Sequence, residues 1–178
     1  QRFVLLLPCT LTRLKGHFDF LSVVAQLKEQ SLPVHGLIVG AEDPNRQDYA
    51  RSLRERVAAL GLADEITFTG HRTDLREIMS VSGAVVSTST KPESFGRTVL
   101  EALCLGKPTF GYNHGGVGEM LAQLYPSGAV SVGNHKELAD RLAAAFRQEL
   151  APPPATREYA LENMLDREIE LYEQLVSN

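Results

Sequence analysis

Two glutamates, Glu93 and Glu101, are eight positions apart, a spacing that could bring both carboxylates to one ligand. Glu93 precedes a predicted helix and Glu101 lies within it, so both carboxylates can approach one ligand and accept hydrogen bonds from sugar hydroxyls. Residues 94–98 add hydroxyls and the free N–H groups of a helix start, which suit an anion. The spacing equally allows Glu101 to pair with Arg97 one turn away, and Glu93 to act as a favourable charge at the helix start.

Positive charges follow the first predicted strand. Arg13, Lys15 and Gly16 offer two cations and a helix start, a combination that suits a phosphate group. By themselves the two cations are equally consistent with solvated loop residues. The chain has no GxxxxGK[ST] segment, and no GxGxxG segment follows its first strand, which argues against a P-loop hydrolase and an ordinary NAD domain.

Glycine marks two further loops. Gly115 and Gly116 open a helix and let backbone come close to a bulky ligand, although a glycine pair alone indicates only a tight turn. His71 follows Gly70 after another predicted strand, in a position that is by itself typical of a surface histidine.

Short apolar runs that alternate with amphipathic stretches predict how these loops are positioned. The alternation is typical of β-α-β units, so we predict an α/β, Rossmann-like parallel sheet of about six strands with helices on both faces. Ligands bind such sheets outside the carboxyl ends of the strands, where the polar loops concentrate. The predicted strands are 2–8, 34–40, 65–69, 83–88, 108–112 and 129–132, and predicted helices lie between 16 and 33, over 49–60, 75–79 and 97–105, after 116, over 138–146 and within 161–175.

Prolines divide the chain near its end. Three consecutive prolines, 152–154, cannot continue a helix, so we expect one domain over residues 1–151. Residues 155–178 are expected to form a helical tail that packs on this domain or on a missing N-terminal domain. The chain begins at Gln1 without a methionine, and we expect it to be a fragment of a longer protein.

Composition narrows the class of protein. The 178 residues, 43% of them hydrophobic, suffice for one domain, and the net charge of −4 argues against nucleic acid as a partner. Cys9 and Cys104 form no disulfide or zinc pattern, which favours a reducing cytosol. No apolar run resembles a signal peptide or a membrane span.

Several short segments together closely resemble the retaining glycosyltransferases of the two-domain B-type architecture, a family-four-like group that includes bacterial mannosyl- and glucosyltransferases. The resemblance covers essentially the whole chain. It implies the C-terminal domain, which binds a nucleoside diphosphate sugar, with most of the acceptor site on a missing N-terminal domain. The segments that carry it are Lys15-Gly16, Gly70-His71, 93–96 with Glu101-Ala102, 106–108, and 115–119.

The resemblance also implies roles for individual residues. Lys15 would neutralise the β-phosphate, Glu93 would contact the donor sugar, and Glu101 would bind the ribose. The main chain at Gly70 and His71 would lie beside the base, which leaves UDP-sugars and GDP-sugars both open. Glu93 and Lys15 are the catalytic candidates; the donor-binding candidates are Thr10, Arg13, Lys15, Gly70, His71, Glu93, Ser94, Phe95, Gly96, Arg97, Thr98 and Glu101.

One position departs from the family pattern. Thr10 stands where the family usually has an arginine, five residues before Lys15, and Arg13 is a nearby candidate to replace that charge. Diphosphate binding is therefore expected to be weakened or arranged differently. The implied reaction is metal-independent transfer of a hexose, with retention of configuration, to a glycan or lipid-linked acceptor, and the fragment alone is expected to be inactive.

Other functions share parts of this pattern. A degenerate nucleotide-sugar-binding domain without turnover and a sugar-nucleotide epimerase of similar fold stay open as alternatives. A flavodoxin-like signalling domain would need acidic residues where Arg13 and Lys15 stand. We expect a cytoplasmic protein of bacterial surface polysaccharide biosynthesis, with peripheral contact to the inner face of the membrane through the missing domain.

Overall fold

A six-stranded parallel sheet forms the centre of the computed structural model, which describes residues 2–43, 47–157, 159 and 161–176. The strand order is β3-β2-β1-β4-β5-β6, and every described pair of neighbours is parallel. The predicted Rossmann-like sheet is therefore confirmed. The strands are β1 (Phe3–Pro8), β2 (Val34–Val39), β3 (Ile66–Gly70), β4 (Ala84–Ser87), β5 (Thr109–Tyr112) and β6 (Ala129–Val130).

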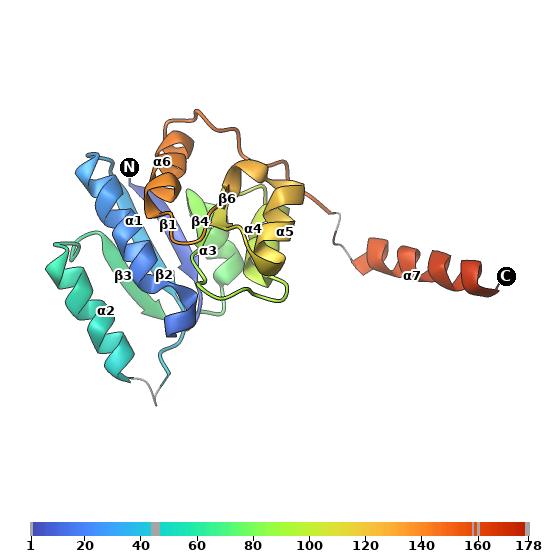
Figure 1. The fold of residues 1–178 in the computed structure, drawn as a ribbon, viewed down its shortest axis with the longest axis horizontal. Coiled ribbons are helices and arrows are strands. Elements are labelled where there is room, and N and C mark those ends of the chain that lie inside the picture. Colours follow the sequence, from blue (N-terminus) through green and yellow to red (C-terminus); the bar gives the residue numbers. More distant parts are fainter. Residues whose placement is uncertain (1, 44–46, 158, 160, 177–178) are drawn as a thin grey trace.

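Successive strands are added on opposite sides of β1. The crossover connections from β1 to β2 and β3 lead toward one edge of the sheet, and those from β4 to β5 and β6 lead toward the other edge. Because such crossovers are right-handed, this change of direction places helices on both faces (Figure 1). One layer holds α1 (His17–Glu29), α2 (Gln47–Ala59) and α6 (His135–Phe146), where α1 packs against both neighbours; the other holds α3 (Leu75–Val81), α4 (Arg97–Cys104) and α5 (Gly115–Leu124).

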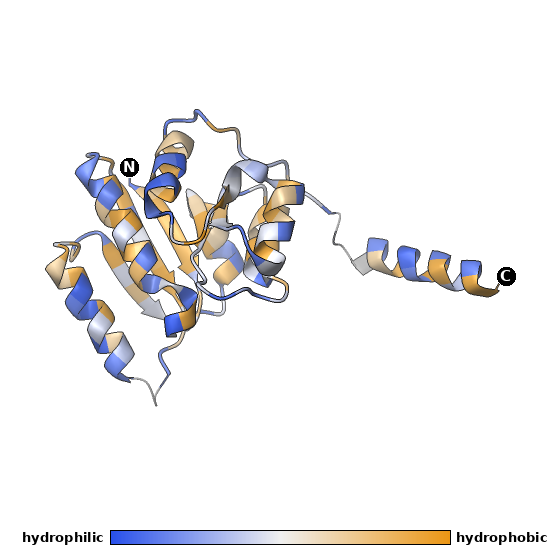
Figure 2. Cartoon of the chain, viewed as in Figure 1, coloured by the Kyte–Doolittle hydropathy of each residue, from blue (hydrophilic) through white to orange (hydrophobic). Residues whose placement is uncertain are grey.

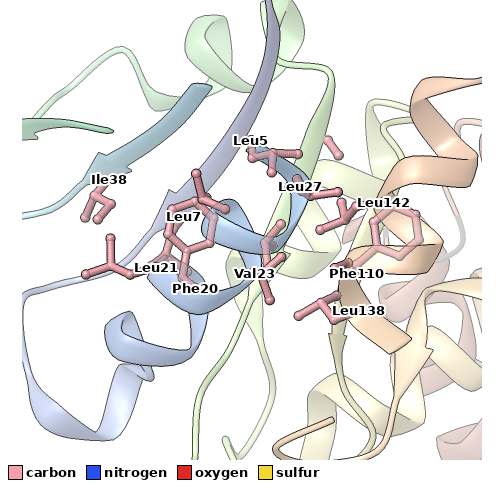
Figure 3. Packing of buried hydrophobic residues seen from close by; sticks show 14 of the residues in the cluster. Leu5, Leu7, Phe20, Leu21, Val23, Leu27, Ile38, Phe110, Leu138 and Leu142 are labelled. Atoms are coloured by element: carbon pink, nitrogen blue, oxygen red, sulfur yellow. The ribbon is translucent and has the colours of Figure 1, made fainter. Parts of the chain in front are cut away.

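The central strand β1 is apolar on both faces because both are covered. Leu5 and Leu7 pack in the larger hydrophobic core with α1 and α6, whereas Leu6 packs in a smaller core with residues such as Met79 of α3. Figure 3 shows Leu7 with Phe20 and Leu21 of α1, and it shows Phe110 of β5 on the side of Leu142 of α6. Apolar residues concentrate in the strands and polar residues on the outer helix faces (Figure 2).

Hydrophobic periodicity does not show how the chain enters α1 and α6. A short 3-10 helix, Arg13–Lys15, precedes α1. The helix predicted over 138–146 begins three residues earlier, at His135, because the side chain of Asn134 accepts a hydrogen bond from the N–H of Glu137 and caps it.

The last helix, α7 (Leu161–Val176), extends away from the rest of the described chain (Figure 1). The apolar side chains of α7 between residues 164 and 176 are exposed, among them Ile169, Tyr172 and Val176. The tail is helical as predicted, and the surface against which it packs stays a prediction. No helix within the described residues is long and apolar enough to cross a membrane.

Replacing Phe110 with alanine tests the larger core. Phe110 is fully buried and packs edge-on against Tyr125, with ring centroids 5.8 Å apart. We expect Phe110→Ala to lower the free energy of unfolding in urea by about 3 to 5 kcal/mol through lost burial and a residual cavity. Val81→Ala, at a side chain that is 81% exposed, should change it little. Equal effects of the two substitutions would contradict this packing.

Candidate functional site

A cavity of about 220 Å³ lies at the carboxyl ends of β1 and β4, where the strand order reverses. Open parallel sheets bind their ligands at this point. The cavity is lined by the ends of both strands, the 3-10 helix, the loop after β4 and the first turn of α4. It brings together five of the predicted site residues: Thr10, Lys15, Glu93, Arg97 and Thr98.

The two predicted catalytic residues form an ion pair in this cavity. Lys15 Nζ donates a hydrogen bond to Glu93 Oε1 at 2.8 Å, and less than a third of either side chain is exposed. The hydroxyl of Ser89 donates to the same carboxylate oxygen. Lys15 is therefore not a freely solvated loop cation, and Glu93 is more than a charge placed near a helix start.

These contacts keep the carboxyl group of Glu93 ionised. Burial alone raises the pKa of a carboxyl group, but the hydrogen bonds from Lys15 and Ser89 and the charges of Lys15 and His114 outweigh burial. The net effect lowers the pKa of Glu93 below its ordinary value of 4.5. At neutral pH Glu93 is an acceptor of hydrogen bonds and cannot donate a proton.

The loop after β5 holds the backbone around Glu93 from one side. The N–H of Gly116 donates to the carbonyl of Glu93 at 2.8 Å, and a Cβ at Gly116 would lie 2.7 Å from the carbonyl oxygen of Ser94. Nε2 of His114 lies 2.8 Å from the carbonyl oxygen of Ser89, and because a carbonyl only accepts, this nitrogen carries the proton. The glycine pair thus permits close backbone packing rather than a turn alone.

The loop after β1 holds the same segment from the other side. The N–H of Thr90 donates to the carbonyl of Leu14 at 2.9 Å. A Cβ at Gly16 would lie 1.8 Å from the carbonyl oxygen of Thr88, and Gly16 has a φ of 67°, so only glycine fits there. Loops from β1, β4 and β5 are therefore joined through residues 88–96.

The start of α4 provides free donors at the cavity. Gly96 caps the helix with a φ of 82°, and the N–H groups of Arg97 and Thr98 have no acceptor among the described residues. Free N–H groups and the helix dipole both favour a negatively charged ligand at such a place.

A buried chain of polar groups lies beneath the loop that carries Lys15. His17 contacts Cys9 Sγ through Nε2 at 3.4 Å and the Tyr49 hydroxyl through Nδ1 at 3.2 Å. Burial lowers the pKa of His17 to about 4 and raises the pKa of Cys9 and of Tyr49 to about 12 each. All three groups are neutral at physiological pH.

Arg13 and Glu101 lie outside the 220 Å³ cavity. The guanidinium carbon of Arg13 lies 5.4 Å from the centre of the Tyr49 ring. Glu101 lines a second cavity, of about 470 Å³, together with Arg76 of α3 and Leu105. Glu101 has no ion pair among the described residues, so its alternative pairing with Arg97 is wrong.

Four of the predicted residues, Gly70, His71, Ser94 and Phe95, line neither of these two cavities. Gly70 ends β3, two strands away from β1, and His71 is exposed after it. Ser94 is exposed, and the half-exposed ring of Phe95 packs edge-on against Tyr159 with centroids 6.4 Å apart. The cavity that holds Lys15 does not include these four residues.

Sequence reasoning did not select the residues that support Glu93 and Lys15. Ser89 lies in the polar loop after β4, and His114 lies beside the glycine pair. These two positions were the only sequence signals that could have indicated a supporting role. No spacing reveals the contacts between Cys9, His17 and Tyr49, because the loop after β1 meets α1 and α2 only in the folded chain. Within the described residues, no group of three His, Cys, Asp or Glu side chains could hold a metal ion.

The fold is a Rossmann-like domain, and its cavity at the switch point of the sheet is lined by Lys15, Arg97 and the start of α4. The chain belongs to the family of glycosyl transferases group 1, whose sequence profile matches residues 1–163. Its solved structural neighbours are glycosyltransferases of the same B-type fold.

Two curated relatives and two solved structures illustrate this membership. Mannosylfructose-phosphate synthase of Agrobacterium fabrum is 35% identical over 68% of this chain and 25% of its own length. D-inositol 3-phosphate glycosyltransferase of Corynebacterium urealyticum is 29% identical over 93% of this chain and 41% of its own. The chain therefore spans less than half the length of either relative.

Anabaena HepE has been solved with UDP and glucose. Its structure aligns with 83% of this chain over 39% of its own length, with a TM-score of 0.77 and 30% sequence identity. A glycosyltransferase from Rickettsia africae shares the fold over all of this chain and 49% of its own, with a TM-score of 0.82 and 23% identity.

The ion pair of Glu93 predicts a pH dependence of stability. Because folding lowers the pKa of this carboxyl group, its stabilising effect is present above the unfolded value of 4.5 and is lost as the pH falls through the folded value. Glu93→Gln should therefore be less stable than the wild type at neutral pH, and this difference should shrink below pH 4.5. Urea unfolding at several pH values, with the exposed Glu55→Gln as control, measures it. A difference that is constant with pH would contradict the ion pair.

Proposed function

We propose that this chain is the donor-binding half of a retaining hexosyltransferase that uses a nucleoside diphosphate sugar without a metal ion. The observation that carries the proposal is the cavity in which Lys15, Glu93 and the free N–H groups of α4 converge. Cations and N–H donors suit a diphosphate, and an ionised carboxylate suits sugar hydroxyls.

The donor is proposed to lie across the two cavities that flank α4. Its phosphates would contact Lys15 and the start of α4, and its sugar would contact Glu93. The ribose would bind Glu101 in the second cavity, and the base would lie beside the main chain at Gly70 and His71. Anabaena HepE has been solved with UDP-glucose, which favours a UDP-sugar over a GDP-sugar.

The proposed chemistry is stabilisation of the departing nucleoside diphosphate by fixed positive groups. Groups held in place before the reaction cost no reorganisation when charge develops on the leaving oxygen. Glu93 is ionised, so it would orient the sugar and would not protonate the leaving group. The acceptor would attack on the face that the diphosphate leaves, which retains the configuration without an enzyme nucleophile.

The acceptor site is proposed to lie on an N-terminal domain of the same polypeptide. The chain spans 25% and 41% of its two curated relatives, and the exposed apolar face of α7 offers a surface for packing against another domain. A role in surface polysaccharide synthesis in the cytoplasm, with membrane contact through that other domain, belongs to this proposal.

The uncharged side chain of Thr10 favours one alternative, a degenerate domain that binds a nucleotide sugar without turnover. The two functions differ in their chemistry. Hydrolysis of the donor, or its transfer, by the longer polypeptide would exclude the degenerate domain.

Calorimetric titration of the chain with UDP, GDP and ADP, with and without magnesium, tests the proposed site. We expect saturable binding of UDP that is unchanged by magnesium, because the cavity provides cations and N–H donors of its own. Binding that requires magnesium would contradict metal independence. Absence of binding to all three nucleotides would contradict the proposed function.

Replacing Glu101 with alanine tests the ribose contact. We expect Glu101→Ala to weaken binding of the nucleotide by about 1.5 to 3 kcal/mol, because it removes hydrogen bonds to a charged group. The control is Glu55→Ala, at an exposed glutamate of α2 that lines neither cavity. Unchanged affinity of the Glu101 variant would show that the ribose binds elsewhere.

The 178-residue chain alone is expected not to transfer sugar, because the acceptor-binding half of the cleft is proposed to lie on another domain. Radiolabelled donor incubated with the chain and simple sugar acceptors provides the assay. Efficient transfer would contradict the proposed division of the two substrates between domains.

A further inference from the structure

The positive charge of the 220 Å³ cavity comes from two side chains. Lys15 and Arg97 line it, whereas Arg13 does not. Glu93 is the acidic residue of the same lining. At neutral pH this set carries two positive charges and one negative charge.

The charge of Lys15 is already balanced before a ligand arrives. Its ammonium group donates to the carboxylate of Glu93 at 2.8 Å, and that carboxylate is ionised. Lys15 and Glu93 together therefore contribute little net charge to the cavity. A diphosphate carries more than one negative charge, so it needs a cation beyond this pair.

Arg97 can be that cation, because it lines the cavity and the N–H donors of its guanidinium group are free within the described part of the chain. It is the first residue of α4, its side chain is exposed, and its guanidinium group has no hydrogen bond or ion pair with any described residue. The free N–H group of Thr98 lies next to it in the same helix turn. A guanidinium group presents a planar set of donors that matches two phosphate oxygens at once.

Arg13 is held in another place. Its guanidinium carbon lies 5.4 Å from the centre of the Tyr49 ring, within the range of a cation–π contact. The Tyr49 hydroxyl is fixed in turn by its 3.2 Å contact with buried His17. The pairing of Arg13 with a ring of α2 leaves Arg97 as the uncompensated cation of the cavity lining.

We propose that the guanidinium group of Arg97 is the second diphosphate-binding cation of this protein, and that Arg13 does not take this role. This inference rests on the proposed function, because it assumes a nucleoside diphosphate in the cavity. It identifies the residue that gives the cavity its net positive charge.

The preference of the chain for a diphosphate over a monophosphate tests the inference. Calorimetry with UDP and UMP gives the ratio of the two affinities. We expect Arg97→Gln to lower this ratio about tenfold, since one charge-assisted contact to the added phosphate is lost. Arg97→Lys, which keeps the charge without the planar donors, should lower it less.

Two further variants separate Arg97 from its rival and from general charge effects. Arg13→Gln should leave the ratio unchanged, and so should Arg56→Gln, an exposed arginine of α2 that does not line the cavity. A ratio that falls for Arg13→Gln and not for Arg97→Gln would overturn the inference. So would a wild-type chain that binds UDP no more tightly than UMP, whereas a chain that binds neither would contradict the proposed function itself.

Discussion

The carboxylate of Glu93 accepts hydrogen bonds from Lys15 and Ser89 at one oxygen, and the rest of the site is arranged around this contact. The two ion-pair partners are 78 positions apart, so their pairing joins the loop after β1 to the loop after β4. The peptide carbonyl of Glu93 is bound at the same time by Gly116, from the loop after β5. These contacts hold three loops in place without a ligand. Binding of a ligand would therefore not have to supply the entropy cost of ordering them.

The direction of the strands explains why these three loops can contact one another. Parallel strands present all their carboxyl ends at one edge, and the reversal of order between β1 and β4 separates α1 from α4 there. Loop residues and the first turn of α4 line the resulting cavity. Small residues are required where backbones meet, as the approach of Gly16 to Thr88 shows.

Hydrophobic patterning predicted all six strands and their parallel arrangement, because central strands such as β1 and β4 are covered on both faces and are therefore short apolar runs. It placed the start of α6 too late, since the cap at Asn134 is polar. Lys15 and Glu93 were selected singly, but their pairing depends on two loops meeting in space. The position of Arg13 depends on Tyr49, which belongs to a helix whose contacts no sequence pattern reports.

The buried chain of Cys9, His17 and Tyr49 has a consequence for how the site responds to its surroundings. With pKa values of about 12, 4 and 12, none of these groups gains or loses a proton near neutral pH. The contacts beneath Lys15 therefore keep one hydrogen-bonding pattern when the pH varies around neutrality. A change in nucleotide binding near neutral pH would therefore come from the nucleotide, such as the terminal phosphate of a free nucleoside diphosphate, and not from these three groups.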